Sequence, residues 1–300
     1  MYLKRRWRWV LIFPVLMSIL LLLYFLTPLP QYPVELKKVK LLPHVNDFEG
    51  TKLATAICVS CHYDPVTQRL SGIRHGNPSK FGVIYSANIT QDSTYGIGKW
   101  TDKELAYFLR TGIRKDGSYV FDMPKYALLS NEDISSIIAF LRSDNPLVRP
   151  VSKSPGITQY SFLSKILLKF YFRPLPYVYT PDSINKNDPI LWGKYLATVK
   201  YSCADCHSYN SLTYVDLEPE KSFGYFKGGN PHYDEHNNRV LSASLRPVRK
   251  FTKTEFTLMV RDGIRKDGSL LKRPMIPFSM LDTSEVNAIY FYLHSLDNGN

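Results

Sequence analysis

The sequence predicts an all-α protein with two tandem domains behind an N-terminal transmembrane helix. Three observations predict this fold class: a basic N-terminus precedes an uncharged apolar stretch, the remaining chain contains an internal repeat, and each copy shows helical patterns with few strand patterns. We expect a membrane anchor at residues 1–30, a first domain at 46–143, a linker at 144–187 and a second domain at 188–300.

The N-terminal segment has the features of a membrane anchor. Four cations within residues 4–8 precede 18 uncharged residues, 9–26, which is near the lower end of the roughly 17–25 residues that span a bilayer. No Ala-x-Ala-like cleavage site follows. We therefore expect a single-pass anchor in the cytoplasmic membrane, through residues 9–26, with the rest of the chain on the periplasmic side. A cleaved secretory signal is the alternative, and it gives the same side.

The charge distribution argues against nucleic-acid binding. Most of the formal net charge of +12 falls on residues 1–45 and 144–187, whereas the two repeated parts are nearly neutral. A protein that neutralises phosphates needs a concentrated basic domain. No nucleic-acid partner is expected.

The internal repeat is clear at two places. Gly-x-x-Leu-Ala-Thr begins at Gly50 and again at Gly193, and the seven residues "GIRKDGS" occur at 112–118 and at 263–269. Such matches, with a slowly drifting offset, indicate a duplicated domain with small insertions. Each copy is expected to contain a helix leading into its cysteines, a helix before the "GIRKDGS" turn and a terminal helix.

The helices before the "GIRKDGS" turns have capping signatures. Thr101 is followed three residues later by Glu104, and Thr252 by Glu255, which is the pattern of a capping box. Apolar residues with helical spacing follow both boxes. We therefore expect helices to begin at these two threonines.

All four cysteines lie in two copies of Cys-x-x-Cys-His, "CVSCH" at 58–62 and "CADCH" at 203–207. A thioredoxin-like redox pair is expected beside a strand–helix–strand pattern, which the sequence lacks. A structural zinc site needs its cysteine pairs much closer than the 145 residues that separate them here. A disulfide in each motif is a further alternative. The motif fits covalent haem attachment best, because two thiols one helical turn apart reach the two vinyl groups and the adjacent imidazole binds iron. Two covalently attached haem c groups are expected, held by Cys58, Cys61, His62, Cys203, Cys206 and His207.

The sixth iron position is expected to be filled by methionine. Met123 and Met275 follow the shared "GIRKDGS" at nearly the same distance, each in a loop that contains proline. Met280 is a rival to Met275 in the second copy, the alternative for any methionine is core packing, and three histidines are rival sixth ligands: His75, His232 and His236. Closed His–Met pairs favour an electron carrier over a catalyst.

At these residues the chain resembles a known family. "CVSCH", the segment "YSANITQDSTYGIGKWTDKELAYFLRTGIRKDG" and the following "MP" are similar to c-type cytochromes related to the membrane-bound cytochrome subunits of alcohol and gluconate dehydrogenases. The resemblance covers residues 46–143 and 188–296. It implies two helical cytochrome c domains, axial pairs His62–Met123 and His207–Met275, and electron transfer on the outer face of the membrane. Those subunits have three haem domains, whereas this chain has two Cys-x-x-Cys-His motifs.

Two further residues lie within the resembling segment. Trp100 is predicted to donate its indole N–H to a haem propionate, with packing at the helix start as the alternative. Asn88 is a similar candidate, with a turn residue as the alternative.

The function predicted from the sequence is single-electron relay by a membrane-anchored dihaem cytochrome c. Its partners are expected to be a redox donor and a redox acceptor, and the chain works alone or as a subunit of a dehydrogenase, oxidase or respiratory complex. The alternative is a dihaem enzyme, such as a peroxidase or thiosulfate dehydrogenase, with one haem open at its sixth position. No other catalytic residues are predicted.

Overall fold

The computed structural model describes residues 3–43, 45–234, 236 and 238–296. Its helices are α1 (Leu3–Leu26), α2 (Asp47–Ile57), α3 (Val59–His62), α4 (Asp102–Thr111), α5 (Asn131–Arg142), α6 (Phe162–Phe170), α7 (Pro189–Tyr195), α8 (Cys203–His207), α9 (Lys253–Thr257) and α10 (Thr283–Ser295). The π-helical segments η3 (Leu196–Lys200) and η7 (Leu258–Asp262) continue α7 and α9. Short 3₁₀ helices are η1 (Leu36–Lys38), η2 (Pro146–Val148), η4 (Ser211–Thr213), η5 (Pro219–Lys221) and η6 (Arg246–Lys250).

The expected helices are present in both halves of the chain. Capping boxes at Thr101 and Thr252 begin α4 and α9 as predicted, because each threonine accepts a hydrogen bond from the glutamate N–H three residues later. The terminal helices are α5 and α10. The predicted ranges 1–30 and 188–300 include a few residues outside the description, namely 1–2, 235, 237 and 297–300.

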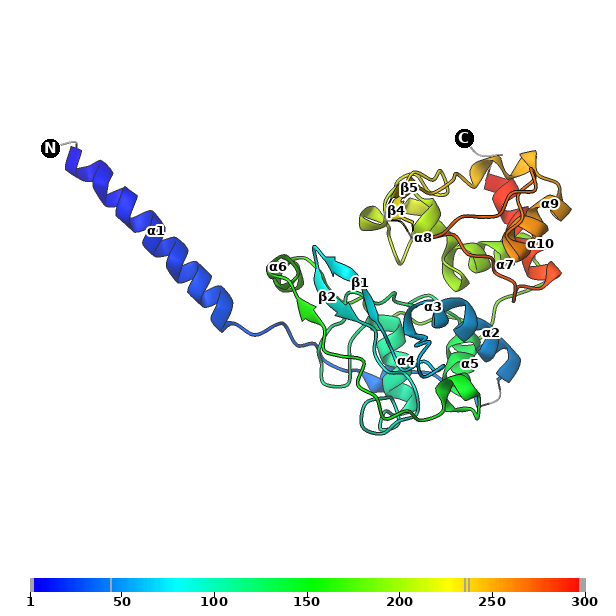
Figure 1. Ribbon diagram of the computed structural model, residues 1–300, viewed down its shortest axis with the longest axis horizontal. Helices are drawn as coiled ribbons and strands as arrows, with labels where there is room; N and C mark the ends of the chain where they lie inside the picture. Colours follow the sequence, from blue (N-terminus) through cyan, green and yellow to red (C-terminus); the bar gives the residue numbers. More distant parts are fainter. Residues whose placement is uncertain (1–2, 44, 235, 237, 297–300) are drawn as a thin grey trace.

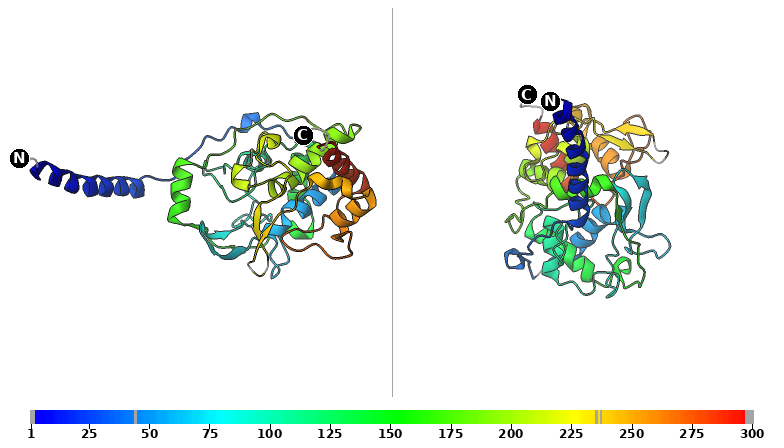
Figure 2. Two further views of the ribbon diagram at one scale, coloured as in Figure 1. Left: turned by 90° about the horizontal axis from the view of Figure 1, so that it is seen from above. Right: turned by 90° about the vertical axis from the view of Figure 1, so that its left-hand side faces the viewer.

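The prediction of an N-terminal transmembrane helix is wrong. The segment does form a helix, α1, which projects from the rest of the molecule in Figure 1 and in the left view of Figure 2. Among the residues that the structure describes, however, no helix is both long enough and apolar enough to cross a bilayer. The basic first turns of α1 leave only residues 9–26 uncharged, which is close to the shortest stretch that can span.

The prediction of an all-α fold is also wrong. β1 (Arg74–Ser79), β2 (Gly82–Tyr85) and β3 (Gln159–Tyr160) form an antiparallel sheet, and β4 (Pro231–Tyr233) pairs with β5 (Arg239–Leu241). These strands are short, and two of them pair across a tight turn of two residues, Lys80 and Phe81. Strands of two to six residues carry too few alternating positions to be recognised in the sequence.

Each half is built on a crossing of two helices, α2 with α5 and α7 with α10 (Figure 1). The contact depends on glycine at the same position of the repeat. A Cβ on Gly50 would collide with the carbonyl oxygen of Ser136, and a Cβ on Gly193 would collide with that of Ala288. The Gly that opens Gly-x-x-Leu-Ala-Thr therefore allows close approach of the helices in both halves.

The segment between the repeats packs on the first half and on the N-terminal segment. β3 extends the first sheet, Asp182 accepts from the Asn131 side chain at 2.9 Å, and Asn88 donates to the carbonyls of Val151 and Lys153. At the end of α6, Lys169 donates to the carbonyl of Thr27 at 2.6 Å, just beyond α1. This segment is therefore an ordered part of the first half.

The two halves meet through buried polar contacts that repeat the same positions. Lys52, two residues after Gly50, pairs with Glu285 at the start of α10. Tyr195, two residues after Gly193, donates to Asp133 at the start of α5, at 2.5 Å. Lys52 and Tyr195 occupy equivalent positions in the two repeats, and so do their partners Glu285 and Asp133. The contacts are therefore reciprocal, as in an isologous interface.

A second lysine joins the two contacts. Lys200 lies 3.0 Å from Asp133 and 3.1 Å from Glu49, and Tyr201 donates to Glu285 at 3.1 Å. Burial alone would lower the pKa of Lys200, but Asp133 and Glu49 outweigh it and raise the pKa. The halves are therefore joined by one connected set of paired charges.

Candidate functional site

Both Cys-x-x-Cys-His motifs form a short helix that ends in the histidine, α3 in the first half and α8 in the second. His62 Nδ1 lies 2.7 Å from the carbonyl oxygen of Ala87, and His207 Nδ1 lies 2.7 Å from that of Ala243. A carbonyl can only accept, so Nδ1 carries the proton and Nε2 keeps a free lone pair. Both imidazoles are thereby fixed in the tautomer that binds a metal through Nε2.

The electrostatic environment keeps these groups neutral. Burial lowers the pKa of His62 and of His207, in spite of the hydrogen bonds to the alanine carbonyls. Burial also raises the pKa of Cys58 and of Cys203 to about 12. At neutral pH the imidazoles are therefore unprotonated at Nε2 and these two thiols are protonated.

All four cysteines are free thiols, but the two motifs differ in exposure. Cys58 is buried and its counterpart Cys203 is half-buried, and Cys61 is half-buried whereas its counterpart Cys206 is exposed. His62 is buried, and its counterpart His207 is only half-buried. The second motif is therefore the more open of the two.

The two methionine loops have matching backbone contacts. Tyr126 N–H donates to the Leu109 carbonyl at 2.8 Å, and Phe278 N–H donates to the Val260 carbonyl at 2.8 Å. Met123 and Met275 each lie three residues before these bonds. Met280 follows the second bond by two residues, where the first half has Leu128. The repeat therefore places Met275, not Met280, at the position of Met123.

Two of the three rival histidines lie in strands. His75 lies in β1 opposite Ile84, and His232 lies in β4 opposite Val240. Burial is the largest cause of the lowered pKa of His62 and of His207, and the hydrogen bonds to the alanine carbonyls oppose it. His75 also lowers the pKa of His62, and His232 lowers that of His207. Each predicted iron-binding histidine thus has a second histidine in its neighbourhood, so both remain rival ligands, as does His236.

Asn88 and Trp100 occupy structural positions. The Asn88 amide donates to two carbonyls of the segment after α5, and its oxygen accepts from the Thr90 N–H and hydroxyl at 2.9 and 2.7 Å. Trp100 packs edge-on against Phe108 at the start of α4, with the Lys115 ammonium 5.5 Å from its ring centroid. A contact of either residue with haem stays a prediction.

Sequence reasoning missed the residues that hold the ligands in place. Ala87 and Ala243 act through main-chain carbonyls, and the only signal was the dipeptide Ser-Ala in both halves. Arg110 and Arg261 each lie two residues before the glycine of "GIRKDGS". Both have a buried Nε–H with no acceptor among the described residues.

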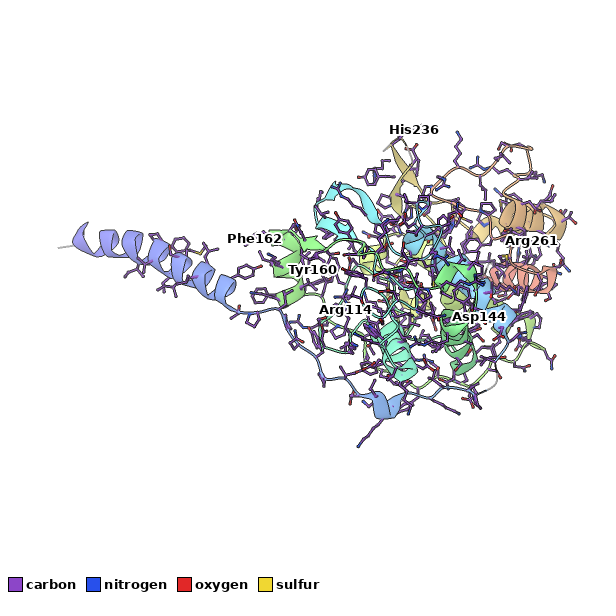
Figure 3. The ribbon with its side chains drawn as sticks, turned by 60° about the horizontal axis from the view of Figure 1, so that its bottom comes forward. Arg114, Asp144, Tyr160, Phe162, His236 and Arg261 are labelled. Atoms are coloured by element: carbon purple, nitrogen blue, oxygen red, sulfur yellow. The ribbon has the colours of Figure 1, made fainter. Side chains whose placement is uncertain are left out.

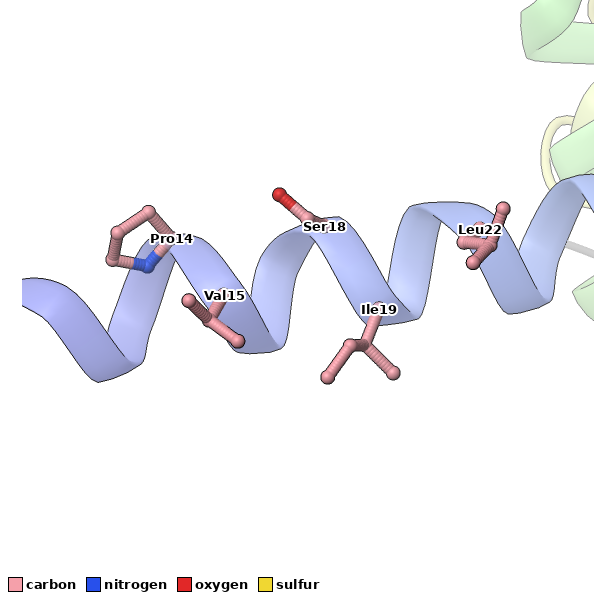
Figure 4. Close-up of a pocket in the computed structure, with 5 residues that line it drawn as sticks. All are labelled: Pro14, Val15, Ser18, Ile19 and Leu22. Atoms are coloured by element: carbon pink, nitrogen blue, oxygen red, sulfur yellow. The ribbon is translucent and has the colours of Figure 1, made fainter.

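These features fit haem c. Each half supplies two thiols, an imidazole oriented for metal binding and a thioether in a matched loop. A shallow pocket also lies along one side of α1, lined by Pro14, Val15, Ser18, Ile19 and Leu22 (Figure 4), but it is away from both motifs.

Comparison with known proteins identifies relatives. No family model matches the chain. The cytochrome c subunit of an alcohol dehydrogenase (quinone) from Gluconacetobacter polyoxogenes is 33% identical over 183 residues, which is 58% of this chain and 38% of that protein. The cytochrome c subunit of gluconate 2-dehydrogenase from Pantoea cypripedii is 28% identical over 187 residues, 59% of this chain and 41% of that protein. A diheme cytochrome c-type protein from Cereibacter sphaeroides is 27% identical over 162 residues, 50% of this chain and 53% of that protein.

The resemblance predicted from the sequence is confirmed: the chain is similar to cytochrome c subunits of alcohol and gluconate dehydrogenases. The chain spans about two fifths of the length of these two dehydrogenase subunits. Because the relatives are named as cytochromes c, the similarity implies covalently attached haem c.

Proposed function

We propose that this protein is a dihaem cytochrome c that relays single electrons between two redox partners. The observation that carries the proposal is the matched pair of histidines, each fixed by an alanine carbonyl inside a Cys-x-x-Cys-His motif. Cys58 and Cys61 would attach one haem, and Cys203 and Cys206 the other. The repeated loops would supply Met123 and Met275 as the sixth ligands.

Bound haem c supplies an iron that takes up and releases one electron. The residues of the chain hold and orient it. The Ala87 and Ala243 carbonyls aim Nε2 of the two histidines, and the buried surroundings of His62 exclude water from the first site. With two protein ligands in place, neither site needs to bind a substrate in order to pass electrons on.

A dehydrogenase is the partner that the comparisons favour, since the relatives are cytochrome subunits of such enzymes. We propose that this chain accepts electrons from a dehydrogenase and passes them to a second redox protein or an oxidase. We further propose that both motifs lie on the periplasmic side of the cytoplasmic membrane. The cations of residues 4–8, placed before an uncharged stretch, are typical of segments that direct export.

Optical spectra of the purified, haem-loaded protein test the proposal. We expect two haems per chain, and one haem in the Cys203→Ala/Cys206→Ala variant. We also expect two equivalents of the near-infrared sulfur-to-iron band. Only one haem in the unaltered chain would contradict the proposal of two attachment sites. Absence of the sulfur-to-iron band from the unaltered chain would contradict methionine ligation and favour rival ligands such as His75 and His232.

A second candidate function is catalysis at the second haem. It is favoured by one observation, the greater exposure of the second motif. Carbon monoxide added to the reduced protein and peroxide added to the oxidised protein distinguish the two functions. A rapid spectral response at one haem, with turnover of peroxide, would support the enzyme, and no response would support the relay.

A further inference from the structure

Arg110 is a cation with no exposed surface near the C-terminal end of α4. Within the described part of the chain it forms no ion pair. Its hydrogen bonds go to neutral acceptors: Nη1 donates to the carbonyls of Ala127 and Leu129 at 3.0 and 2.8 Å, and Nη2 donates to the side chains of Asn131 and Thr180, both at 3.1 Å. A buried cation is tolerated only when such acceptors surround it. The four hydrogen bonds therefore hold the guanidinium and its four acceptors in place.

The acceptors show what Arg110 holds. Ala127 and Leu129 belong to the loop that follows Met123, which is further tied to α4 by the backbone bond from Tyr126 to Leu109. The remaining acceptors lie at the start of α5 and in the segment between the repeats. Arg110 therefore fastens the methionine loop of the first half to α4 from one side and to the following segment from the other.

Arg261 occupies the same place in the second repeat but makes different contacts. It is half-exposed, and no hydrogen bond or ion pair of its guanidinium is present among the described residues. Figure 3 labels it on the second half, near α9. The methionine loop of the second half is held by the backbone bond from Phe278 to Val260, without the arginine.

The difference has a cause in the winding of the helix. Gly112 N–H bonds to the carbonyl of Phe108, four residues back, whereas Gly263 N–H bonds to that of Leu258, five residues back. The π-helical turn η7 is wider than an α-helical turn and displaces the side chains within it. Arg261 thus lies in a wider turn than the α-helical turn that carries Arg110.

We infer that Arg110 is a positioning residue for the loop that carries Met123, and that the second half lacks this restraint on Met275. The inference rests on the proposed function, because it assumes that both methionines bind iron. Its consequence is an asymmetry between the haems: the first methionine stays bound, and the second is exchanged more readily for an added ligand.

The test uses full-length, haem-loaded protein in two backgrounds, Met275→Ala and Met123→Ala. The first background is compared with and without Arg110→Gln, and the second with and without Arg261→Gln. In the Met275→Ala chain the sulfur-to-iron band reports Met123 alone, and in the Met123→Ala chain it reports Met275 alone. We expect Arg110→Gln to reduce the first band at least twofold and to raise the affinity of that reduced haem for carbon monoxide about tenfold. Arg261→Gln is expected to leave the second band unchanged.

Two results would overturn the inference: a full Met123 band in a folded Arg110→Gln variant, or an equal loss of band from Arg261→Gln. If Arg110→Gln does not fold, Thr180→Val removes only one acceptor of Nη2 and is expected to weaken the Met123 band partially; an unchanged band there counts against the inference. Loss of both bands in the unaltered chain would instead refute the proposed axial ligands.

Discussion

At Gly50 and Gly193 the missing side chain is what lets two helices touch. We expect Gly50→Ala to lower the free energy of unfolding by about 2 kcal/mol. The new methyl group would collide with a main-chain carbonyl, which cannot move aside as a side chain can, so we take the upper end of the roughly 1–3 kcal/mol that overpacking costs. The better helix propensity of alanine offsets about 1 kcal/mol of this loss. Urea unfolding followed by circular dichroism measures the change. Thr51→Ala, one residue away, is the control, and equal stability of the glycine variant and the control would contradict the expectation.

The site residues that a sequence can indicate are those whose chemistry is carried by their own side chains. The cysteines, His62 and His207 could be predicted because spacing along the chain sets their geometry. Ala87 and Ala243 could not, because a main-chain carbonyl leaves no mark on residue type. Arg110 escaped notice because its partners lie up to 70 residues away along the chain.

Among the secondary-structure elements, the helices before the "GIRKDGS" turns begin at identical caps but end differently. Thr101 and Thr252 each close a capping box. We expect Thr101→Ala to lower the free energy of unfolding by about 1 kcal/mol, because one N–H of the first turn loses its acceptor. Thermal unfolding measures this loss.

The control for the cap is Lys103→Ala, which alters an exposed side chain in the same turn of α4. It is expected to change the stability by less than about 0.5 kcal/mol. A Thr101→Ala variant as stable as this control would show that the cap contributes nothing measurable.

The helices could be predicted from caps and apolar spacing, whereas the strands and the π-helical turns could not. β3 joins the first sheet from more than 70 residues along the chain, so no local pattern announces its pairing. Length does not distinguish η7 from an α-helical turn, since α4 has the same length between its cap and its glycine. The second half has two more residues before Cys203 than the first half has before Cys58, and there the chain forms the π-helical η3 and a break at Tyr201 and Ser202.

For the molecule as a whole, the ion pair of Lys52 and Glu285 joins the halves, and the two side chains are only 1% and 3% exposed. We expect Lys52→Met to lower the free energy of unfolding by about 3–5 kcal/mol, because it leaves the Glu285 carboxylate buried without its cation. The double variant Lys52→Met/Glu285→Leu is expected to recover most of the loss. Chemical denaturation of the full chain measures both values.

The matched control is Lys194→Met, which removes an exposed lysine paired with Glu220 at 3.1 Å. Exposed pairs contribute at most about 1 kcal/mol. Similar losses from Lys52→Met and Lys194→Met would mean that the contact between the halves adds little to the stability of the protein.

The interface between the halves also bears on how such a chain can change over evolutionary time. Two separate copies of one ancestral domain, paired about a twofold axis, would be forced to place the same residue on both sides of every such contact. Fusion into one polypeptide releases that constraint. Here one copy uses the ammonium of Lys52 and the other the phenol of Tyr195 against equivalent carboxylates. Gene fusion therefore permits the two copies to diverge independently at the contacts between them.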